Sequence, residues 1–202
     1  MSRYIKFRYQ RTRPDIAAFD ALAELNACRR KLFELRLIGV DSNGVGFGNL
    51  SVRDGVKGNF YITGSATGGL PELTPTDCAR VVAYDFAKNW IGYEGAAVPS
   101  SESLTHAAIY ESDPSTSAVI HCHDSVLWRT RLNIVPTTSK AIAYGTPEMA
   151  YEIIQLFTVS DVRGKQIFVM AGHEGGIVTF GKNLEAAFDV LMREQKESSP
   201  CI

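Results

Sequence analysis

The chain has 202 residues, which suits one domain with a full hydrophobic core or two very small domains. Its 45% hydrophobic and 21% charged residues are typical of soluble globular proteins and argue against extensive disorder. The formal net charge of −1 provides no field that would attract nucleic acid or a membrane surface, so we expect neither as a partner.

The sequence also indicates a reducing compartment. The N-terminus lacks an apolar run long enough for a signal peptide, and no segment approaches the roughly 20 apolar residues of a membrane span. The cysteines are far apart and form no Cys-x-x-Cys pair, so neither a disulfide framework nor a thiolate zinc cluster is expected. They are Cys28, Cys78, Cys122 and Cys201. The expected location is the cytoplasm.

A basic arm, residues 1–13, comes first in the chain. Its cationic side chains, with no acid among them, are Arg3, Lys6, Arg8, Arg11 and Arg13. Two interpretations stay open: the arm is solvated or packs against another subunit, or it binds an anion. The aromatic residues Tyr4, Phe7 and Tyr9 lie between the charges and indicate that the arm packs on something.

Helices and short strands follow the arm. A long helix is predicted from Pro14, which suits a first helical position, to a stop at Gly39. Strands are predicted at 49–53, 59–63, 80–86, 90–94, 118–123, 166–171 and 177–180. Further helices are predicted from Ser100 or Ser101 to about 112, at 146–157 and at 183–196, with a brief one at Thr74-Pro75 and a frayed tail at 197–202.

Several consecutive strands are joined as hairpins. This order favours a central, largely antiparallel or mixed sheet covered by helices over a doubly wound parallel sheet. The sequence has neither a glycine-rich dinucleotide motif nor a phosphate-loop lysine, so it does not support a dinucleotide cofactor or an ATPase.

The most informative stretch is Val119-Ile120-His121-Cys122-His123. Side chains two apart on a strand point the same way, so His121 and His123 can present both imidazoles to one point. Either they are satisfied polar residues at a strand end, or they bind a metal. Catalytic zinc usually takes three protein ligands. His173 follows a second apolar strand and is the candidate third ligand, whereas His106 lies inside a predicted helix and is expected to be structural.

Glu102 lies at a predicted helix start, in Pro99-Ser100-Ser101-Glu102. An acid there often serves only the helix dipole or a capping box, but it could also act in chemistry. The hydroxyls of Ser100 and Ser101, together with helix N-terminal N–H groups, make a natural cradle for an anion. The loops at 48–51 and 63–69 either supply further donors or are ordinary turns.

These segments together resemble the class II aldolase/adducin family, in order from about Phe19 to Arg193. The combination of Pro-Ser-Ser-Glu and His-x-His is specific. The matching segments are 48–51, 62–63 with the glycine loop after it, 73–75, 99–102, 118–123, 144–148, and the run from 172 to 181.

The resemblance implies a fold, an assembly and a chemistry. The fold would be a single α/β/α layered domain, here 14–196, with a central, mostly antiparallel sheet flanked by helices. The assembly would be a cyclic homotetramer. The chemistry would be that of a metal-dependent lyase, which cleaves a small ketose, phosphorylated or not, through a metal-stabilised enediolate. Zinc is preferred for an imidazole-rich site, although manganese, iron and cobalt also accept it.

Site residues carry over by position. The family's first two metal histidines fall on His121 and His123, and its metal-binding, acid–base glutamate falls on Glu102. Its phosphate-binding groups fall on Asn49, Ser100, Ser101, Thr67 and Gly68. The partner acid for the aldehyde half is not identified, and Tyr144 is a candidate because it lies near a matched segment.

The chain departs from the family pattern twice. His173-Glu174-Gly175-Gly176 stands where the family has His-Gly directly before a strand. We expect a two-residue bulge that returns His173 to the metal, with Glu174 as the alternative ligand. The glycine loop is one residue longer than usual, which leaves a phosphorylated substrate open. An epimerase or dehydratase on the same site, and a non-catalytic adducin-like interaction domain, are the alternative functions.

Overall fold

The structure of the chain is a computed structural model that describes residues 5–55 and 58–198. Its strands are Arg8–Arg13 (β1), Gly39–Val40 (β2), Gly46–Phe47 (β3), Asn49–Arg53 (β4), Phe60–Thr63 (β5), Cys78–Asp85 (β6), Trp90–Glu94 (β7), Ala118–His123 (β8), Ile167–Val169 (β9) and Gly176–Gly181 (β10). Its helices are Leu22–Glu34 (α1), the 3-10 turn Pro75–Asp77 (η1), Ser103–Ser112 (α2), Ser125–Arg131 (α3), Pro147–Val159 (α4), Val162–Lys165 (α5) and Leu184–Ser198 (α6).

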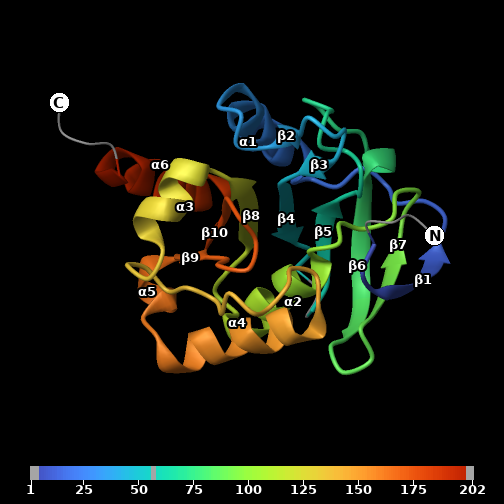
Figure 1. Cartoon of the computed structure of the whole chain (residues 1–202). Coiled ribbons are helices and arrows are strands. Elements are labelled where there is room, and N and C mark those ends of the chain that lie inside the picture. The colour runs from blue at the N-terminus through green and yellow to red at the C-terminus, as the bar shows by residue number, and fades with distance from the viewer. Residues whose placement is uncertain (1–4, 56–57, 199–202) are drawn as a thin grey trace.

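The main sheet has the strand order β1-β7-β6-β5-β4-β8-β10-β9. Its strands pair in antiparallel fashion, apart from β1, which runs parallel to β7. Helices cover both faces, with α1 and α6 on one side and α2 and α4 on the other (Figure 1). The predicted α/β layered domain with a mostly antiparallel central sheet is therefore confirmed.

Each face of the sheet has its own hydrophobic core. Leu50 and Ile120 pack with α1 and α6, whereas Val119 and Phe180 pack with α2 and α4. Neighbouring residues on β8 divide between the two cores because side chains alternate along a strand. This alternation decides which layer each functional side chain of β8 faces.

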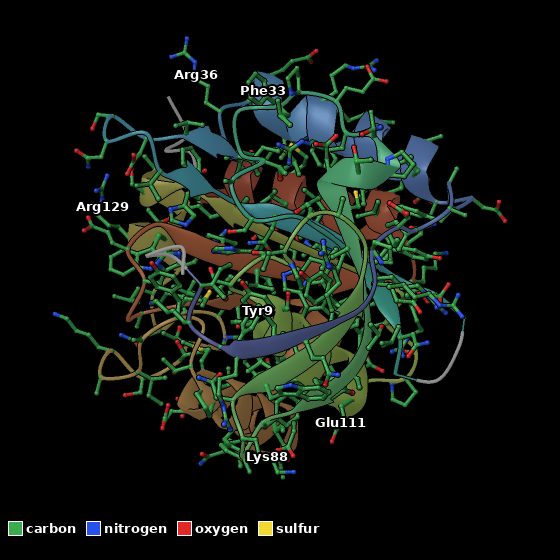
Figure 2. The ribbon with its side chains drawn as sticks, turned by 90° about the vertical axis from the view of Figure 1, so that its right-hand side faces the viewer. Tyr9, Phe33, Arg36, Lys88, Glu111 and Arg129 are labelled. Atoms are coloured by element: carbon green, nitrogen blue, oxygen red, sulfur yellow. The ribbon has the colours of Figure 1, made fainter. Side chains whose placement is uncertain are left out.

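The N-terminal arm is partly built into the sheet. Its residues from Arg8 to Arg13 form β1, an edge strand that Figure 2 views with Tyr9 toward the reader. Tyr9 meets Tyr93 of β7 edge to face, with ring centroids 5.9 Å apart. Arg3 lies outside the described residues, as do Cys201 and the end of the tail. The division into arm, domain 14–196 and tail from 197 stays a prediction.

The helix predicted from Pro14 is wrong over its first two turns, because α1 begins only at Leu22. Phe19 shows the physical reason. Its ring stacks on that of Tyr61 in β5, with centroids 3.9 Å apart and planes within 5°. Tertiary packing of the apolar residues therefore replaces the helix that their spacing favours.

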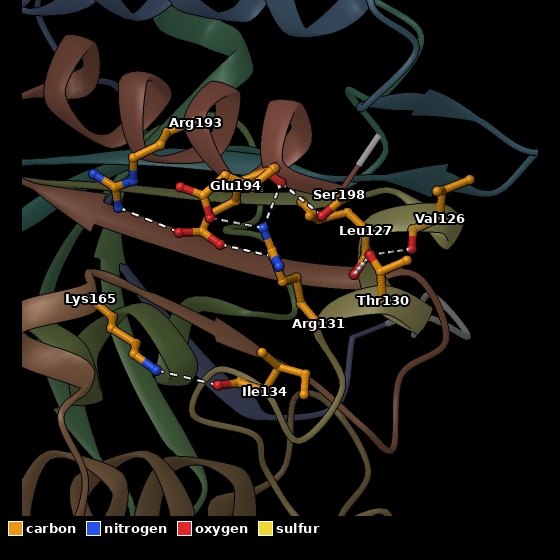
Figure 3. Close-up of polar contacts among 10 residues, drawn as sticks. Val126, Leu127, Thr130, Arg131, Ile134, Lys165, Arg193, Glu194 and Ser198 are labelled. Atoms are coloured by element: carbon orange, nitrogen blue, oxygen red, sulfur yellow. Dashed lines mark hydrogen bonds and ion pairs between the residues drawn. The ribbon is translucent and has the colours of Figure 1, made fainter. Parts of the chain in front are cut away.

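Helix α3 and the short α5 were not among the predicted elements. Asp124 caps α3 by accepting hydrogen bonds from the N–H groups of Val126 and Leu127, each at 2.9 Å. Figure 3 shows how α3 is held to α6: the Arg131 Nε atom lies 2.9 Å from Glu194 Oε2. These contacts anchor the chain directly after His123.

Within the described residues, no helix is both long and apolar enough to cross a bilayer. Cys28, Cys78 and Cys122 are buried and free.

A small hairpin, β2 with β3, leads through Gly48 into β4. Gly48 has a φ of +78°. A Cβ atom there would lie 2.3 Å from Ile38 Cγ2 and 3.2 Å from the His121 carbonyl oxygen. Gly48 therefore lets the hairpin pass closely over the strand that carries the histidines.

Replacement of Gly48 by alanine tests this close approach, and Gly44 is the matched control. Both glycines have a φ of +78°, but a Cβ atom at Gly44 would have nothing within 4 Å. We expect Gly44→Ala to lower the free energy of unfolding by about 1–2 kcal/mol, from backbone strain alone. Gly48→Ala should lower it by about 1–3 kcal/mol more, because of the overlap with Ile38. Equal values in urea denaturation would contradict this account.

His106 is a core residue, as predicted. It lies fully buried on α2, and its Nδ1 atom is 2.6 Å from the Ser51 hydroxyl, which also contacts the Tyr110 hydroxyl at 2.8 Å. Burial lowers the pKa of His106 to about 3. The imidazole is therefore neutral in the folded protein at any ordinary pH.

The buried His106 predicts acid sensitivity. Its pKa in the unfolded chain is about 6.5, so below that pH the unfolded state takes up a proton that the folded state refuses. This contribution to stability is complete above pH 6.5 and falls by about 1.4 kcal/mol for each pH unit below about 6. In the metal-free protein, His106→Gln should make the decline between pH 6 and 4 shallower by that amount. Parallel curves of unfolding free energy against pH would refute the assignment.

Candidate metal centre

Strand β8 presents His121 and His123 on the face of the sheet that α2 covers. Val119, two residues earlier, belongs to the core on this face, whereas Ile120 and Cys122 belong to the opposite core. The strand is fixed from both sides, since His121 is paired with Asn49 of β4 and His123 with Gly176 of β10. The common orientation predicted from the two-residue spacing is what the strand produces.

His173 reaches the same point from the turn between β9 and β10. The turn is closed by backbone hydrogen bonds from His173 N to Met170 O at 3.0 Å and from Gly176 N to His173 O at 2.8 Å. A Cβ atom on Gly176 would lie 2.8 Å from the His173 ring. Glycine at this position leaves room for the imidazole to fold back beside β8.

The three imidazoles converge. One ring nitrogen of each lies within 4.8 Å of the others. The Nε2 atoms of His123 and His173 are 2.9 Å apart, and the ring centroids of His121 and His173 are 5.3 Å apart. Glu174, the alternative ligand, is exposed and is not part of this group.

All three rings are neutral at physiological pH. Burial lowers the pKa of His121 well below its ordinary value, and the neighbouring His123 and His173 lower it further. Burial also lowers the pKa of His123 to about 4 and that of His173 to about 3. Neutral imidazole is the form that binds metals, so the protonation state suits a cation.

Two buried polar atoms beside the histidines have no partner within the described residues. One is His121 Nε2 and the other is Asn49 Oδ1. The Asn49 amide lies 3.2 Å from His121 Nδ1, so it contacts the other nitrogen of the same ring. An orphaned ring nitrogen that faces two further imidazoles is the donor set that zinc accepts. The residues present therefore fit a metal ion.

Glu102 is the buried carboxyl group of the site. It is 2% exposed, and Oε2 accepts a hydrogen bond from the Thr105 hydroxyl at 2.8 Å, while Oε1 has no partner within the described residues. Burial raises the pKa of Glu102 to about 7, against the opposing effects of Thr105 and the Lys6 charge. Glu102 lines the same cavity as the histidines but lies outside the three-histidine group.

The cavity of about 330 Å³ brings the predicted residues together. The three histidines and Glu102 lie in its wall, and so do all the residues predicted to hold a phosphate group: Asn49, Thr67, Gly68, Ser100 and Ser101. The Gly64–Pro99 bridge joins the glycine loop to the Pro-Ser-Ser-Glu segment. The hydroxyl proton of Thr67 is already used within the loop, because it donates to Gly64 O at 2.7 Å.

Sequence reasoning missed one part of the wall and one residue that contacts the wall from behind. The β2–β3 hairpin contributes Phe47, whose ring lies 5.3 Å from that of His123. The turn dipeptide Asn43-Gly44 is a hairpin signal that could have located it. Lys6 of the arm donates to the Tyr144 carbonyl at 2.9 Å and lies 3.1 Å from the centre of that ring. No local pattern could place an arm lysine there.

Tyr144, which we named as a candidate acid, lines the cavity. Its ring centroid is 4.2 Å from that of His173. Lys6, Tyr144 and His173 therefore form a contiguous row from the arm to the imidazole cluster.

The chain is similar in sequence and fold to several known proteins. A curated relative, 3-oxo-tetronate 4-phosphate decarboxylase from Pectobacterium atrosepticum, is 31% identical, over 71% of this chain and 78% of its own. An L-fuculose 1-phosphate aldolase structure is 25% identical with a TM-score of 0.68, covering 91% of this chain and 84% of that one. A sugar-phosphate aldolase from Thermotoga maritima, 17% identical, has the same fold, with a TM-score of 0.67 over 89% of this chain and 92% of that one.

Residues 24–195 match the family described as the class II aldolase and adducin N-terminal domain. The match spans most of the chain and includes every predicted site residue. On this ground the chain belongs to the class II aldolase and adducin family.

Proposed function

We propose that this protein is a metal-dependent lyase that cleaves a small ketose phosphate beside its carbonyl group. The observation that carries the proposal is the convergence of three neutral imidazoles next to a buried carboxyl group, in one cavity. A site that only stabilised the fold would not need four polar side chains around an open cavity, because burying polar groups without partners is unfavourable.

His121, His123 and His173 would hold the cation. We prefer zinc, while manganese, iron and cobalt remain acceptable for such ligands. When bound, the cation supplies Lewis acidity for negative charge that develops on the substrate's carbonyl and hydroxyl oxygens. Asn49 would orient the His121 ring, because its amide contacts the second ring nitrogen.

In its neutral form Glu102 would give a proton to the carbon left behind by cleavage, and in its ionised form it would serve as a fourth ligand before substrate arrives. Its free Oε1 atom can accept a proton, while the Thr105 hydroxyl holds Oε2. A pKa near 7 lets a carboxyl group act as base and then as acid at neutral pH. In cleavage, Tyr144 would accept the proton of the hydroxyl that becomes the aldehyde carbonyl, and it would return that proton in the reverse addition, because its ring lies against His173.

The glycine loop and the two serines would bind the anionic end of the substrate. Ser100 and Ser101 precede α2, while Ala66 and Gly68 present loop backbone to the same cavity. Backbone N–H groups and hydroxyls are the donors that phosphate oxygens accept. The names of the relatives support a phosphorylated substrate, since they describe an aldolase and a decarboxylase that each act on a phosphorylated compound.

Decarboxylation is the second candidate reaction. It is favoured by the curated relative at 31% identity, whose name describes loss of a carboxyl group from a 3-oxo acid phosphate. Both reactions leave negative charge next to a carbonyl, so the same donors would serve either. Epimerisation or dehydration on this site, and a non-catalytic interaction domain, remain alternatives. The cyclic homotetramer implied by the family remains a prediction.

Metal content tests the ligand set. We expect alanine at His121, His123 or His173 to weaken zinc binding by more than about 100-fold, because even changes in the outer shell cost roughly 10- to 100-fold. Glu174→Ala is the matched control, since Glu174 is the exposed neighbour of His173 and should leave the metal in place. Elemental analysis after dialysis gives the stoichiometry, and circular dichroism checks the fold. Full metal content in His121→Ala would remove the basis of the proposal.

A substrate panel tests the reaction. The metal-loaded protein is offered ketose phosphates and 3-oxo acid phosphates, and the products are identified. Aldol cleavage gives two carbon fragments, decarboxylation releases carbon dioxide, and epimerisation gives neither. Glu102→Gln should lower the rate by about 10²- to 10⁴-fold, the usual range for a lost acid–base group. Unchanged turnover in Glu102→Gln would exclude Glu102 as the proton carrier.

A further inference from the structure

Arg29 of α1 is a fully buried cation that lies behind the glycine loop. Its Nη2 atom donates to the carbonyls of Thr67 at 2.5 Å and Gly68 at 3.2 Å, and its Nε atom donates to the Leu70 carbonyl at 2.7 Å. The third nitrogen, Nη1, is buried without a partner among the described residues. Arg29 also makes no ion pair with a carboxylate in that part of the chain.

This placement is unfavourable unless something offsets the charge. Burial lowers the pKa of Arg29, but a guanidinium still keeps its proton at neutral pH. A buried charge is normally paired with an opposite charge or bound to an ion. Here the partners are three backbone carbonyls, all from the segment between Thr67 and Leu70.

The carbonyl contacts orient the loop. In a trans peptide the C=O and the following N–H point in opposite directions, and the described chain contains no cis peptide bond. Since the Thr67 and Gly68 carbonyls face Arg29, the N–H groups of Gly68 and Gly69 face away from it. Neither N–H group donates to another described residue. Gly68 is part of the cavity wall, between Arg29 and Gly46 of the hairpin, so a ligand in the cavity lies next to this segment of backbone.

The loop is held from the other side by the β2–β3 hairpin, next to α1 in Figure 1. A Cβ atom on Gly68 would lie 2.2 Å from Gly39 O and 2.8 Å from Gly46 Cα. The backbone at Gly68 is therefore clamped between the guanidinium and the hairpin. A clamped loop keeps its donors in place before a ligand arrives, which reduces the ordering that binding requires.

We propose that Arg29 is a positioning residue for a phosphate group bound in the cavity. It fixes the 67–70 backbone so that free N–H groups face the ligand, and it places a positive charge directly behind them. A dianionic phosphate in front of the loop and the guanidinium behind it offset one another across a poorly solvated layer. This proposal rests on the proposed function, because it names the charged end of the same substrate.

The test uses the metal-loaded full chain with inorganic phosphate as the probe and acetate as the comparison anion. Titration calorimetry should show that Arg29→Met weakens phosphate binding by about tenfold or more, while zinc content stays unchanged. Arg29→Lys keeps the charge but loses the three-carbonyl fork, so its loss should be intermediate. Arg30→Met is the matched control and should bind like the parent, since Arg30 is the adjacent, exposed residue that pairs with Glu72.

Hydrogen exchange on the unmodified protein adds a measurement that needs no variant. Phosphate should slow exchange at the Gly68 and Gly69 amides, and acetate should not. Phosphate affinity that is equal in Arg29→Met, Arg29→Lys and the parent would overturn the proposal, as would absent protection of these amides. Acetate that binds as tightly as phosphate would overturn the assignment to a phosphate group. Loss of zinc from His121→Ala together with unprotected loop amides would leave the metal centre standing and remove only Arg29's role.

Discussion

The site depends on one constraint, the two-residue period of β8 held in fixed register. Asn49 of β4 is opposite His121 and Gly176 of β10 is opposite His123, so the strand cannot slip by one residue without disrupting both neighbours. A slip would turn the imidazoles into the core under α6 and bring Ile120 and Cys122 to the cavity. The hydrophobic alternation that builds the two cores thus also points the histidines proposed as metal ligands into the cavity, so the arrangement of the site is a consequence of sheet packing.

Around this strand, several ionisable groups have pKa values shifted from those they would have in water. The three imidazoles are neutral, the Glu102 carboxyl group has a pKa of about 7, and two cations, Lys6 and Arg29, are drawn in from the arm and α1. Each is displaced from its ordinary behaviour mainly by burial. Perturbed groups gathered in and directly around one cavity are the usual mark of a functional site, and here they suit a metal ion and an anionic substrate.

The sequence predicted what depends on local pattern. The strands at Asn49–Arg53 and Ala118–His123 have their predicted bounds because alternation and β-branched residues specify them directly. The prediction of a helix from Pro14 was wrong over its first two turns, because the Phe19 ring stacks on Tyr61 and this tertiary contact replaces the helix. His173 could be suggested because it follows a second apolar strand, but only folding brings the turn at Gly176 against β8. Lys6 and Arg29 carry no local signal, since their partners lie 138 and 38 to 41 residues away in sequence.

The parallel pairing of β1 with β7 anchors the N-terminal arm, and this has a consequence for how members of the family can differ from one another. Residues 24–195 are the part shared with the family, yet Lys6 comes from outside that part and touches the cavity wall at Tyr144. The segment ahead of the shared domain is thus a place where a substitution can alter the surroundings of the cavity without changing a residue that lines it. A fusion partner or purification tag joined to that segment would act on the same contact.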